Sequence, residues 1–204
     1  ALAPEPAQIV ITGGTHTPSG PPFCFLSESW LPQLRAMGAG VELSLDRWGF
    51  FPAGGGRITA RVTPSRLSPT TLVRRGPVVR LRTTAAVAMV NPKAARLALR
   101  ALTTALTAAQ QQRGWPAFPA FEQQVHRVPD SRGPGTILWL RADTANASAV
   151  FSAVRPTIVS QLTQVGDDAA DIDALAAQVA SDAVAWLASG AATEGHLAAS
   201  LIVP

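Results

Sequence analysis

IVITGGTHTPSGPPFCFLSESWLPQLRAMGAGVELSLDRWGFFPAGGGR, residues 9–57, is the stretch that decides the fold. Its β-branched opening, residues 9–11, predicts a short strand, and Gly13 and Gly14 end that strand in a turn. Apolar residues then recur three or four positions apart, so we expect a helix with one buried face. The residues of that predicted face are Leu26, Trp30, Leu34 and Met37.

The second half of this stretch changes to an alternating pattern. Val41, Leu43 and Leu45 alternate with polar neighbours, which predicts a strand with one buried face. The glycine triplet 54–56 follows, and since glycine loses much backbone entropy on folding, it indicates unusual dihedral angles or the close approach of another group. Residues 57–62 alternate again, so we expect a hairpin across the glycine turn.

The middle of the chain predicts a strand followed by a long helix. Residues 78–90 fit one long strand or two short strands. Asn91 suits the N-cap of the next helix, and Pro92 suits its first position. We expect that helix to run to about residue 112, where Gly114 and the prolines after it break the pattern.

The last part of the chain predicts three more strands and a second long helix. We expect strands over residues 122–128, 136–141 and 151–159, the last of them returning to the main body. The helix should start at Asp167 or Asp168, and Gly190 should end it. The residues of its predicted buried face are Ile172, Leu175, Val179, Ala183 and Trp186.

Composition places the chain among α/β proteins with a substantial core. It has 204 residues, of which 47% are apolar, enough for one large or two small units. A run of about 18 apolar residues, the minimum for a membrane span, is absent, and the opening residues do not resemble a secretory signal. Cys24 is the only cysteine, which excludes an internal disulfide and a CxxC metal site. We therefore expect a cytoplasmic protein without a membrane partner.

Charge is distributed unevenly along the chain, although the net charge is only +4. No acidic residue lies between Asp46 and Glu122, so this interval is a candidate surface for a polyanion. An alternative is that these basic strands face the acidic last helix within the fold. Arginine suits phosphate because of its planar fork of donors. The basic residues of the interval are Arg47, Arg57, Arg61, Arg66, Arg74, Arg75, Arg80, Arg82, Lys93, Arg96, Arg100 and Arg113.

Motifs for metal or nucleotide chemistry are missing from the sequence. His16, His126 and His196 are far apart, and none lies in a metal-binding spacing, so we expect no metal ligand set. The glycine triplet lacks the lysine and hydroxyl residue of a phosphate-binding P-loop. A nucleophile near His16 is disfavoured because no glycine elbow presents Cys24 or the nearby serines.

Four motifs in fixed order resemble the RNA 3′-terminal phosphate cyclase family. The first is GGT followed by Pro21-Pro22, after which a helix carries a Leu-Pro-x-Leu step. The second is GFFPAGGG at residues 49–56, and the third is DSRGPG at residues 130–135. The fourth is SGAA at residues 189–192 with HLA at residues 196–198. Together they extend over most of the chain.

The resemblance implies an ATP-dependent enzyme that acts on RNA 3′ ends. Members of the family use ATP to adenylylate a histidine and pass AMP to an RNA 3′-phosphate, whose neighbouring 2′-hydroxyl closes a 2′,3′-cyclic phosphate. The cofactors implied are ATP and Mg²⁺. Pro21-Pro22 matches the step that packs against adenine, and His196 matches the residue that covers its other face, with an exposed helix-end histidine as the alternative. The residues that we expect to contact RNA phosphate are Arg47, Arg57, Arg74 and Arg75.

Several positions depart from the family pattern. His16, Cys24 and Ala199 stand where the family has acidic residues. The family's first third and its adenylylated histidine have no counterpart, since that histidine would lie beyond Pro204, so no catalytic residue is assigned. We therefore expect a fragment, or a chain that a second chain or missing segments complete, and inactive by itself.

The expected fold class is α/β (α+β), with a cyclase-like body of repeated strand and helix units around four-stranded sheets. Residues 1–76 and 151–204 should form part of the main body, and residues 77–150 a small α/β insert domain. The favoured function is RNA 3′-terminal phosphate cyclisation. The alternative is a non-catalytic relative that binds RNA or ribonucleoprotein through the basic interval, and a third is a domain whose basic stretch is only surface.

Overall fold

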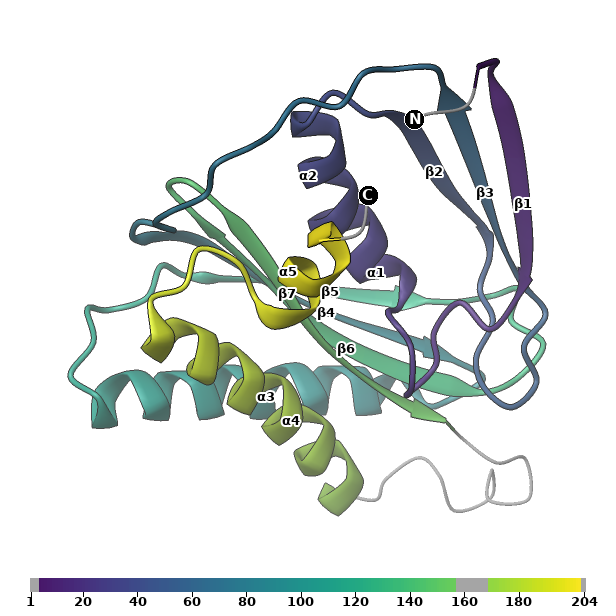
Figure 1. Ribbon diagram of the computed structural model, residues 1–204. Helices are drawn as coiled ribbons and strands as arrows, with labels where there is room; N and C mark the ends of the chain where they lie inside the picture. Colours follow the sequence, from purple (N-terminus) through teal and green to yellow (C-terminus); the bar gives the residue numbers. More distant parts are fainter. Residues whose placement is uncertain (1–3, 157–168, 203–204) are drawn as a thin grey trace.

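The computed structural model describes residues 4–156 and 169–202 as two sheets with helices packed around the larger one (Figure 1). This mixed content confirms the expected α+β class. A π-helical turn, η1, joins α1 to α2. The elements in chain order are β1 (Ala7–Gly13), α1 (Phe23–Phe25), η1 (Leu26–Trp30), α2 (Leu31–Ala36), β2 (Gly40–Arg47), β3 (Gly56–Thr63), β4 (Val78–Ala88), α3 (Pro92–Gln112), β5 (Phe121–Arg127), β6 (Gly135–Thr144), β7 (Ser148–Pro156), α4 (Ala169–Ser189) and α5 (Gly195–Ile202).

The larger sheet has four strands in the order β5-β4-β6-β7. β4 is one continuous strand, which settles the sequence alternatives, and it runs parallel to β5 and antiparallel to β6. Because β4 lies between β5 and β6, the loop of residues 128–134 must cross the end of β4. That crossing brings the DSRGPG motif to the end of the sheet where β4 and β5 finish and β6 begins.

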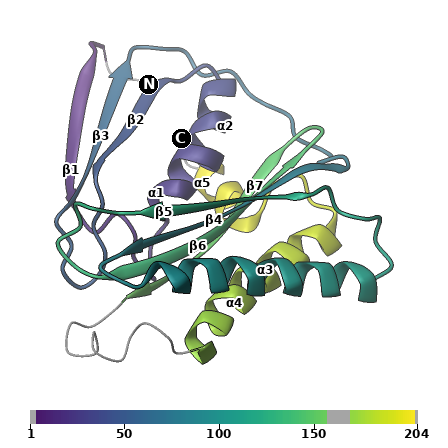
Figure 2. The ribbon, with the colours of Figure 1, turned by 180° about the vertical axis from the view of Figure 1, so that it is seen from behind.

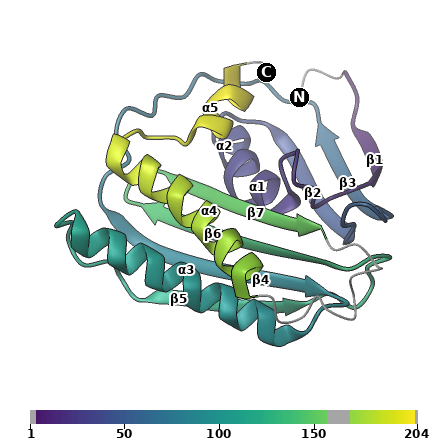
Figure 3. The ribbon, with the colours of Figure 1, turned by 90° about the horizontal axis from the view of Figure 1, so that it is seen from below.

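The two long helices, α3 and α4, cover one face of this sheet (Figure 3). Asn91 caps α3 as predicted, since its side-chain oxygen accepts a hydrogen bond from the Lys93 N–H at 3.0 Å. The predicted stripe of α4 lies in or against the same core, and Gly190 ends the helix at φ +69°. The predicted start of α4 at Asp167 or Asp168 lies outside the described residues. Apolar packing of α3 on α4 thus holds this layer together.

The opposite face of the sheet is covered in part by the helical segment α1-η1-α2 and by α5. Cys24 and Phe25 of α1 pack there with Leu197 of α5. The predicted stripe of this first helix is only half-buried, and Leu31 is buried instead. The π-helical turn explains the difference, because its extra residue rotates the following side chains away from a 3.6-residue repeat.

The smaller sheet has the order β1-β3-β2 and lies beside the larger one. β2 and β3 form the predicted hairpin, with Leu45 opposite Ile58. The strand predicted at residues 9–11 is β1, but its partner was not predicted: β1 pairs antiparallel with β3 and ends with Gly13 opposite Gly56. The first and second glycine motifs therefore meet at one end of this sheet.

The boundary predicted at residue 150 falls inside β7. β7 pairs with β6 instead of leaving the sheet, and α4 packs on α3, so the four-stranded unit continues past residue 150. The division into a main body and an insert domain stays a prediction. Among the described residues, no helix combines the length and apolar character needed to cross a bilayer.

Candidate functional site

Three glycine-containing turns interlock at the meeting point of the two sheets. The N–H groups of Thr15 and His16 both donate to the Gly49 carbonyl, at 2.9 and 3.0 Å. The Gly49 N–H in turn donates to the Thr15 hydroxyl at 2.9 Å. A Cβ at Gly49 would lie 2.5 Å from the Gly13 carbonyl oxygen, so only glycine allows this approach.

The third turn, residues 130–135, packs against the second in the same way. A Cβ at Gly133 would lie 2.4 Å from the Ala53 Cβ, and one at Gly135 would lie 2.3 Å from the Phe50 ring. Gly55, at φ +72°, carries the Arg132 side chain directly over it. Both reasons proposed for the glycine triplet, unusual dihedral angles and close approach, are therefore confirmed.

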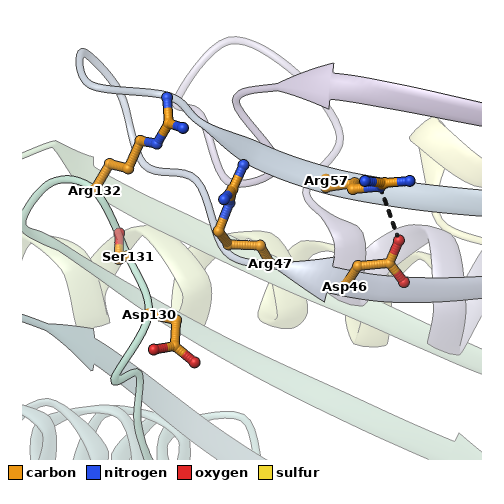
Figure 4. A pocket seen from close by; sticks show the side chains of 6 residues that line it. All are labelled: Asp46, Arg47, Arg57, Asp130, Ser131 and Arg132. Carbon is orange, nitrogen blue, oxygen red and sulfur yellow. Dashed lines mark ion pairs between the residues drawn. The ribbon is translucent and has the colours of Figure 1, made fainter.

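A cleft of about 810 Å³ opens where these turns meet, and we call it the glycine-turn cleft (Figure 4). Its residues come from the end of β2, the start of β3 and the 128–134 loop. Motifs that are far apart in the sequence thus contribute to one concave surface. The lining residues are Asp46, Arg47, Arg57, Asp130, Ser131 and Arg132.

The arginines keep most of their donors available to a ligand. Arg47 donates from Nε to the Gly55 carbonyl at 2.5 Å, which fixes the base of its guanidinium. A guanidinium has five N–H donors, so this bond leaves four for an anion. In Figure 4 the Arg47 and Arg132 side chains project to the same side of the cleft. This arrangement suits the oxygens of a phosphate.

The acidic residues of the cleft offset only part of this positive charge. The Asp46 carboxylate accepts from the hydroxyls of Thr59 and Ser44, and these bonds lower the pKa of Asp46, the Thr59 bond most. Asp46 also pairs with Arg57 at 3.4 Å. The Asp130 carboxylate points away from the guanidinium groups in Figure 4. Arg47 and Arg132 have no carboxylate within ion-pair distance among the described residues.

The structure does not bring the four predicted RNA-contacting arginines together. Arg47 and Arg57 line the cleft, but Arg74 and Arg75 lie beside the turn at the far end of β6, where Asn146 bonds both of their carbonyls. β6 has 10 residues, which makes it about 33 Å long. A single phosphate therefore cannot reach both pairs.

Arg75 has a structural contact that explains its half-buried position. Its Nη2 donates to the Leu187 carbonyl at 2.7 Å, and its guanidinium lies 5.0 Å from the centre of the Trp186 ring. These contacts fasten the segment before β4 to α4. Contact of Arg74 or Arg75 with RNA stays a prediction.

The residues expected to hold adenine lie on elements that pack together. Pro22 is buried at the start of α1, whereas Pro21 is exposed. His196 is exposed on the first turn of α5, and the adjacent Leu197 is buried against the α1 cluster. Stacking of adenine between Pro21-Pro22 and His196 stays a prediction.

Two functional candidates were missed from the sequence. Arg132 lies within the recognised DSRGPG motif, but only the fold places it beside Arg47. Glu194 is buried and accepts from the N–H groups of His196 and Leu197 at 2.7 and 2.5 Å, so it caps α5 and fixes the backbone that carries His196. The sequence signal for this cap was the position of Glu194 directly before a short segment with apolar residues at helical spacing.

His16 and Cys24, two of the residues expected to stand at acidic positions of the family, are both buried. His16 is 0% exposed and stacks on Trp48 at 4.2 Å, and burial lowers its pKa to about 3. Burial raises the pKa of the Cys24 thiol well above its ordinary value, and Glu28 adds to the effect. Neither residue can act as an exposed acid or nucleophile. In the described parts of the chain, His, Cys, Asp and Glu form no group of three or more suited to a metal ion.

Comparison with known proteins gives consistent matches. The family model described as RNA 3′-terminal phosphate cyclase matches residues 1–204. The RNA 3′-terminal phosphate cyclase of Pseudomonas aeruginosa is 36% identical over 198 residues, which cover 97% of this chain and 52% of that protein. The enzyme of that name from Ralstonia nicotianae is 33% identical over 205 residues, covering 100% of this chain and 52% of that protein. The chain spans about half the length of the curated relatives it matches.

Proposed function

This chain belongs to the RNA 3′-terminal phosphate cyclase family, and from that premise we propose that its glycine-turn cleft binds the RNA 3′-phosphate in ATP-dependent cyclisation. The product would be a 2′,3′-cyclic phosphate. The observation that carries the proposal is one cleft with three arginines, lined by residues on both sides of the GFFPAGGG motif and by residues of the DSRGPG motif. The catalytic activity itself, the RNA substrate and the use of ATP remain parts of the proposal.

Within the cleft, Arg47 and Arg132 would hold the terminal phosphate by charge-assisted hydrogen bonds. Arg57 is partly neutralised by Asp46, so it would contribute less to binding. The rigid glycine turns would fix these groups before the RNA arrives, which reduces the ordering cost of binding. Orientation of the phosphate toward its own 2′-hydroxyl is the step assigned to these residues.

The nucleotide would lie near α5, between Pro21-Pro22 and His196. The exposed His196 ring and the exposed Pro21 are compatible with a stacked base. ATP, when bound, would supply the adenylate that turns the RNA phosphate into an activated anhydride. Mg²⁺ would be held mainly by phosphates and water, because such sites commonly use few protein ligands. A cytoplasmic location and completion of the fold by further segments also stay predictions.

The test compares binding of one RNA with a 3′-phosphate and with a 3′-hydroxyl. Arg47→Gln and Arg132→Gln should each weaken binding of the phosphorylated RNA about 10- to 100-fold, the effect of losing about 1.5–3 kcal/mol of charged hydrogen bonding. Binding of the 3′-hydroxyl RNA should change much less. Arg113→Gln, at the other end of α3, is the matched control. Equal losses for both RNAs would refute a phosphate site in the cleft.

A second candidate, a non-catalytic RNA-binding relative, is favoured by the burial of His16 and Cys24 at positions where the family has acids. Incubation of the whole natural protein with α-labelled ATP separates the two. A covalent AMP adduct together with a cyclic phosphate product supports the enzyme. RNA binding that depends on Arg47 and Arg132, without adduct or product, supports the binding protein.

A further inference from the structure

One end of the four-stranded sheet gathers basic residues that the glycine-turn cleft does not use. β4 and β5 both finish there, α3 begins there, and the 128–134 loop crosses it (Figure 2). Lys93 and Arg96 lie on the first turns of α3, and Arg127 is the last residue of β5. We call these three residues the basic rim.

Within the part of the chain that the structure describes, no ion pair explains the basic rim structurally. Lys93, Arg96 and Arg127 are all exposed. Among the described residues, 4–156 and 169–202, none of the three forms an ion pair. Glu122 and Asp130 are the acidic residues nearest to Arg127 in the sequence; Glu122 pairs with Arg80 and Arg82 instead, and Asp130 forms no ion pair with the rim in the described parts of the chain. Positive charge therefore remains concentrated at this end.

The basic rim is continuous with the cleft through the crossing loop. Arg127 opposes Val87 near the end of β4, and the loop that follows carries Arg132 across β4 to Gly135 at the start of β6. The distance from β5 to β6 is two strand spacings, about 10 Å. Lys93 and Arg96 are separated by about 4.5 Å along the helix axis. With these two separations, one RNA strand could contact the rim and the cleft through several successive phosphates.

An exposed apolar side chain lies at the same end. Met89 is 62% exposed and has φ +54°, a conformation that few residues other than glycine adopt. It follows β4 directly, at the end of the strand that the 128–134 loop crosses. Methionine suits contact with flat, variable partners because it is flexible and polarisable. A nucleobase is such a partner.

We propose that the basic rim binds the RNA backbone upstream of the 3′ end, with Met89 against a base. The inference rests on the proposed function, since it requires the 3′-phosphate to lie in the cleft. A single strand fits better than a duplex because an exposed base is needed for Met89. The rim would contact phosphates without sequence preference, while the cleft selects the end of the chain.

The test measures affinity against salt for RNAs with a 3′-phosphate, one of about four nucleotides and one of about twelve. The whole natural protein is compared with the double variant Arg96→Gln/Arg127→Gln. For the longer RNA the slope of log affinity on log salt should fall by about 1.4, since each phosphate contact contributes about 0.7. Raising salt from about 50 to about 200 mM should therefore weaken wild-type binding about sevenfold more than variant binding. The shorter RNA should show little change.

Two single variants sharpen the result. Met89→Asn keeps a residue that tolerates positive φ, so it should fold, weaken binding of the longer RNA and leave the salt slope unchanged. Arg113→Gln should leave affinity and slope at their wild-type values. An unchanged slope in the double variant, or an equal loss for both RNAs, would overturn the rim.

Failure of the rim and failure of the proposed function give different patterns. If only the rim is wrong, both RNAs still bind through Arg47 and Arg132, and the double variant behaves like wild type. If the proposed function is wrong, the shorter RNA binds equally with and without its 3′-phosphate, and Arg47→Gln has no selective effect. If the double variant loses binding to anionic lipid vesicles, while its effect on RNA affinity does not depend on RNA length, the rim binds a membrane surface instead. That result would also overturn the proposal.

Discussion

The neutral, buried His16 should make the stability of this protein sensitive to mild acid. The ring is 0% exposed, stacks on Trp48 with centroids 4.2 Å apart, and lies beside Phe50 at 5.5 Å. Its Nδ1 shares a 2.8 Å hydrogen bond with the Thr15 hydroxyl, and its Nε2 has no partner among the described residues. Burial alone lowers its pKa from 6.5 to about 3.

The sign follows from proton binding. Below pH 6.5 the unfolded chain takes up a proton that the folded chain does not, so stability falls as pH decreases toward 3. About pH 5 lies about 1.5 units below the unfolded-state pKa of 6.5, so the protein should have lost about 2 kcal/mol of unfolding free energy relative to neutral pH. Because the ordinary pKa values of Asp and Glu are about 4, their titration contributes little to the change in stability above about pH 5.

The assay is urea unfolding followed by tryptophan fluorescence at about pH 7 and about pH 5. His16→Phe keeps a ring in the stack and removes the titration, so its loss of stability between the two pH values should be about 2 kcal/mol smaller than that of wild type. His126→Phe changes an exposed histidine, so this variant should lose as much stability between the two pH values as the wild type, because His16 is still present. Equal losses in wild type and His16→Phe would refute the assignment of the acid sensitivity to His16.

Three further predictions concern the turns and the core. Gly135→Ala should lower the free energy of unfolding by about 1–3 kcal/mol, because the new methyl group would overlap the Phe50 ring; urea unfolding measures this, and wild-type stability would argue against the interlocked turns. Asn91→Ala should lower the free energy of unfolding by about 1 kcal/mol, because it removes the cap on the Lys93 N–H, whereas Asn91→Ser should keep most of the capping energy; equal urea midpoints for the two variants would argue against the cap. The Cys24 thiol should resist iodoacetamide in the folded protein and react after denaturation, as followed by mass; rapid labelling of the native protein would contradict its burial.

Local sequence patterns predicted most of the helices and strands, but not which strands pair with one another in space. The β2–β3 hairpin and the Asn91 cap depend on residues close in sequence, and both are as predicted. The position of β4 between β5 and β6 depends on non-local pairing, which periodicity cannot reveal. The π-helical turn was also invisible, because the residues from Leu26 to Trp30 fit a 3.6-residue repeat.

The candidate site was predicted in part for the same reason. The GFFPAGGG motif that Arg47 and Arg57 flank was recognised, but Arg132 joins them only because the 128–134 loop crosses β4. Arg74 and Arg75 appeared equivalent in a one-dimensional charge count. The fold places them beside the turn at the far end of β6, a separation that no local pattern contains.

The ion pairs of the fold argue against one explanation of the basic interval, that it faces the acidic last helix. If its arginines served mainly to face the acidic last helix, ion pairs would join them to α4. Among the described residues they instead pair with Glu28, Asp46 and Glu122, and the ion pair to α4 comes from Arg155, outside the interval. α4 packs on α3 through apolar side chains, so that layer does not depend on neutralising the interval. Arg47 at the cleft and Lys93 and Arg96 at the basic rim are among the residues of the interval without an ion pair in the described parts of the chain, and there an anion would supply the partner that the fold does not.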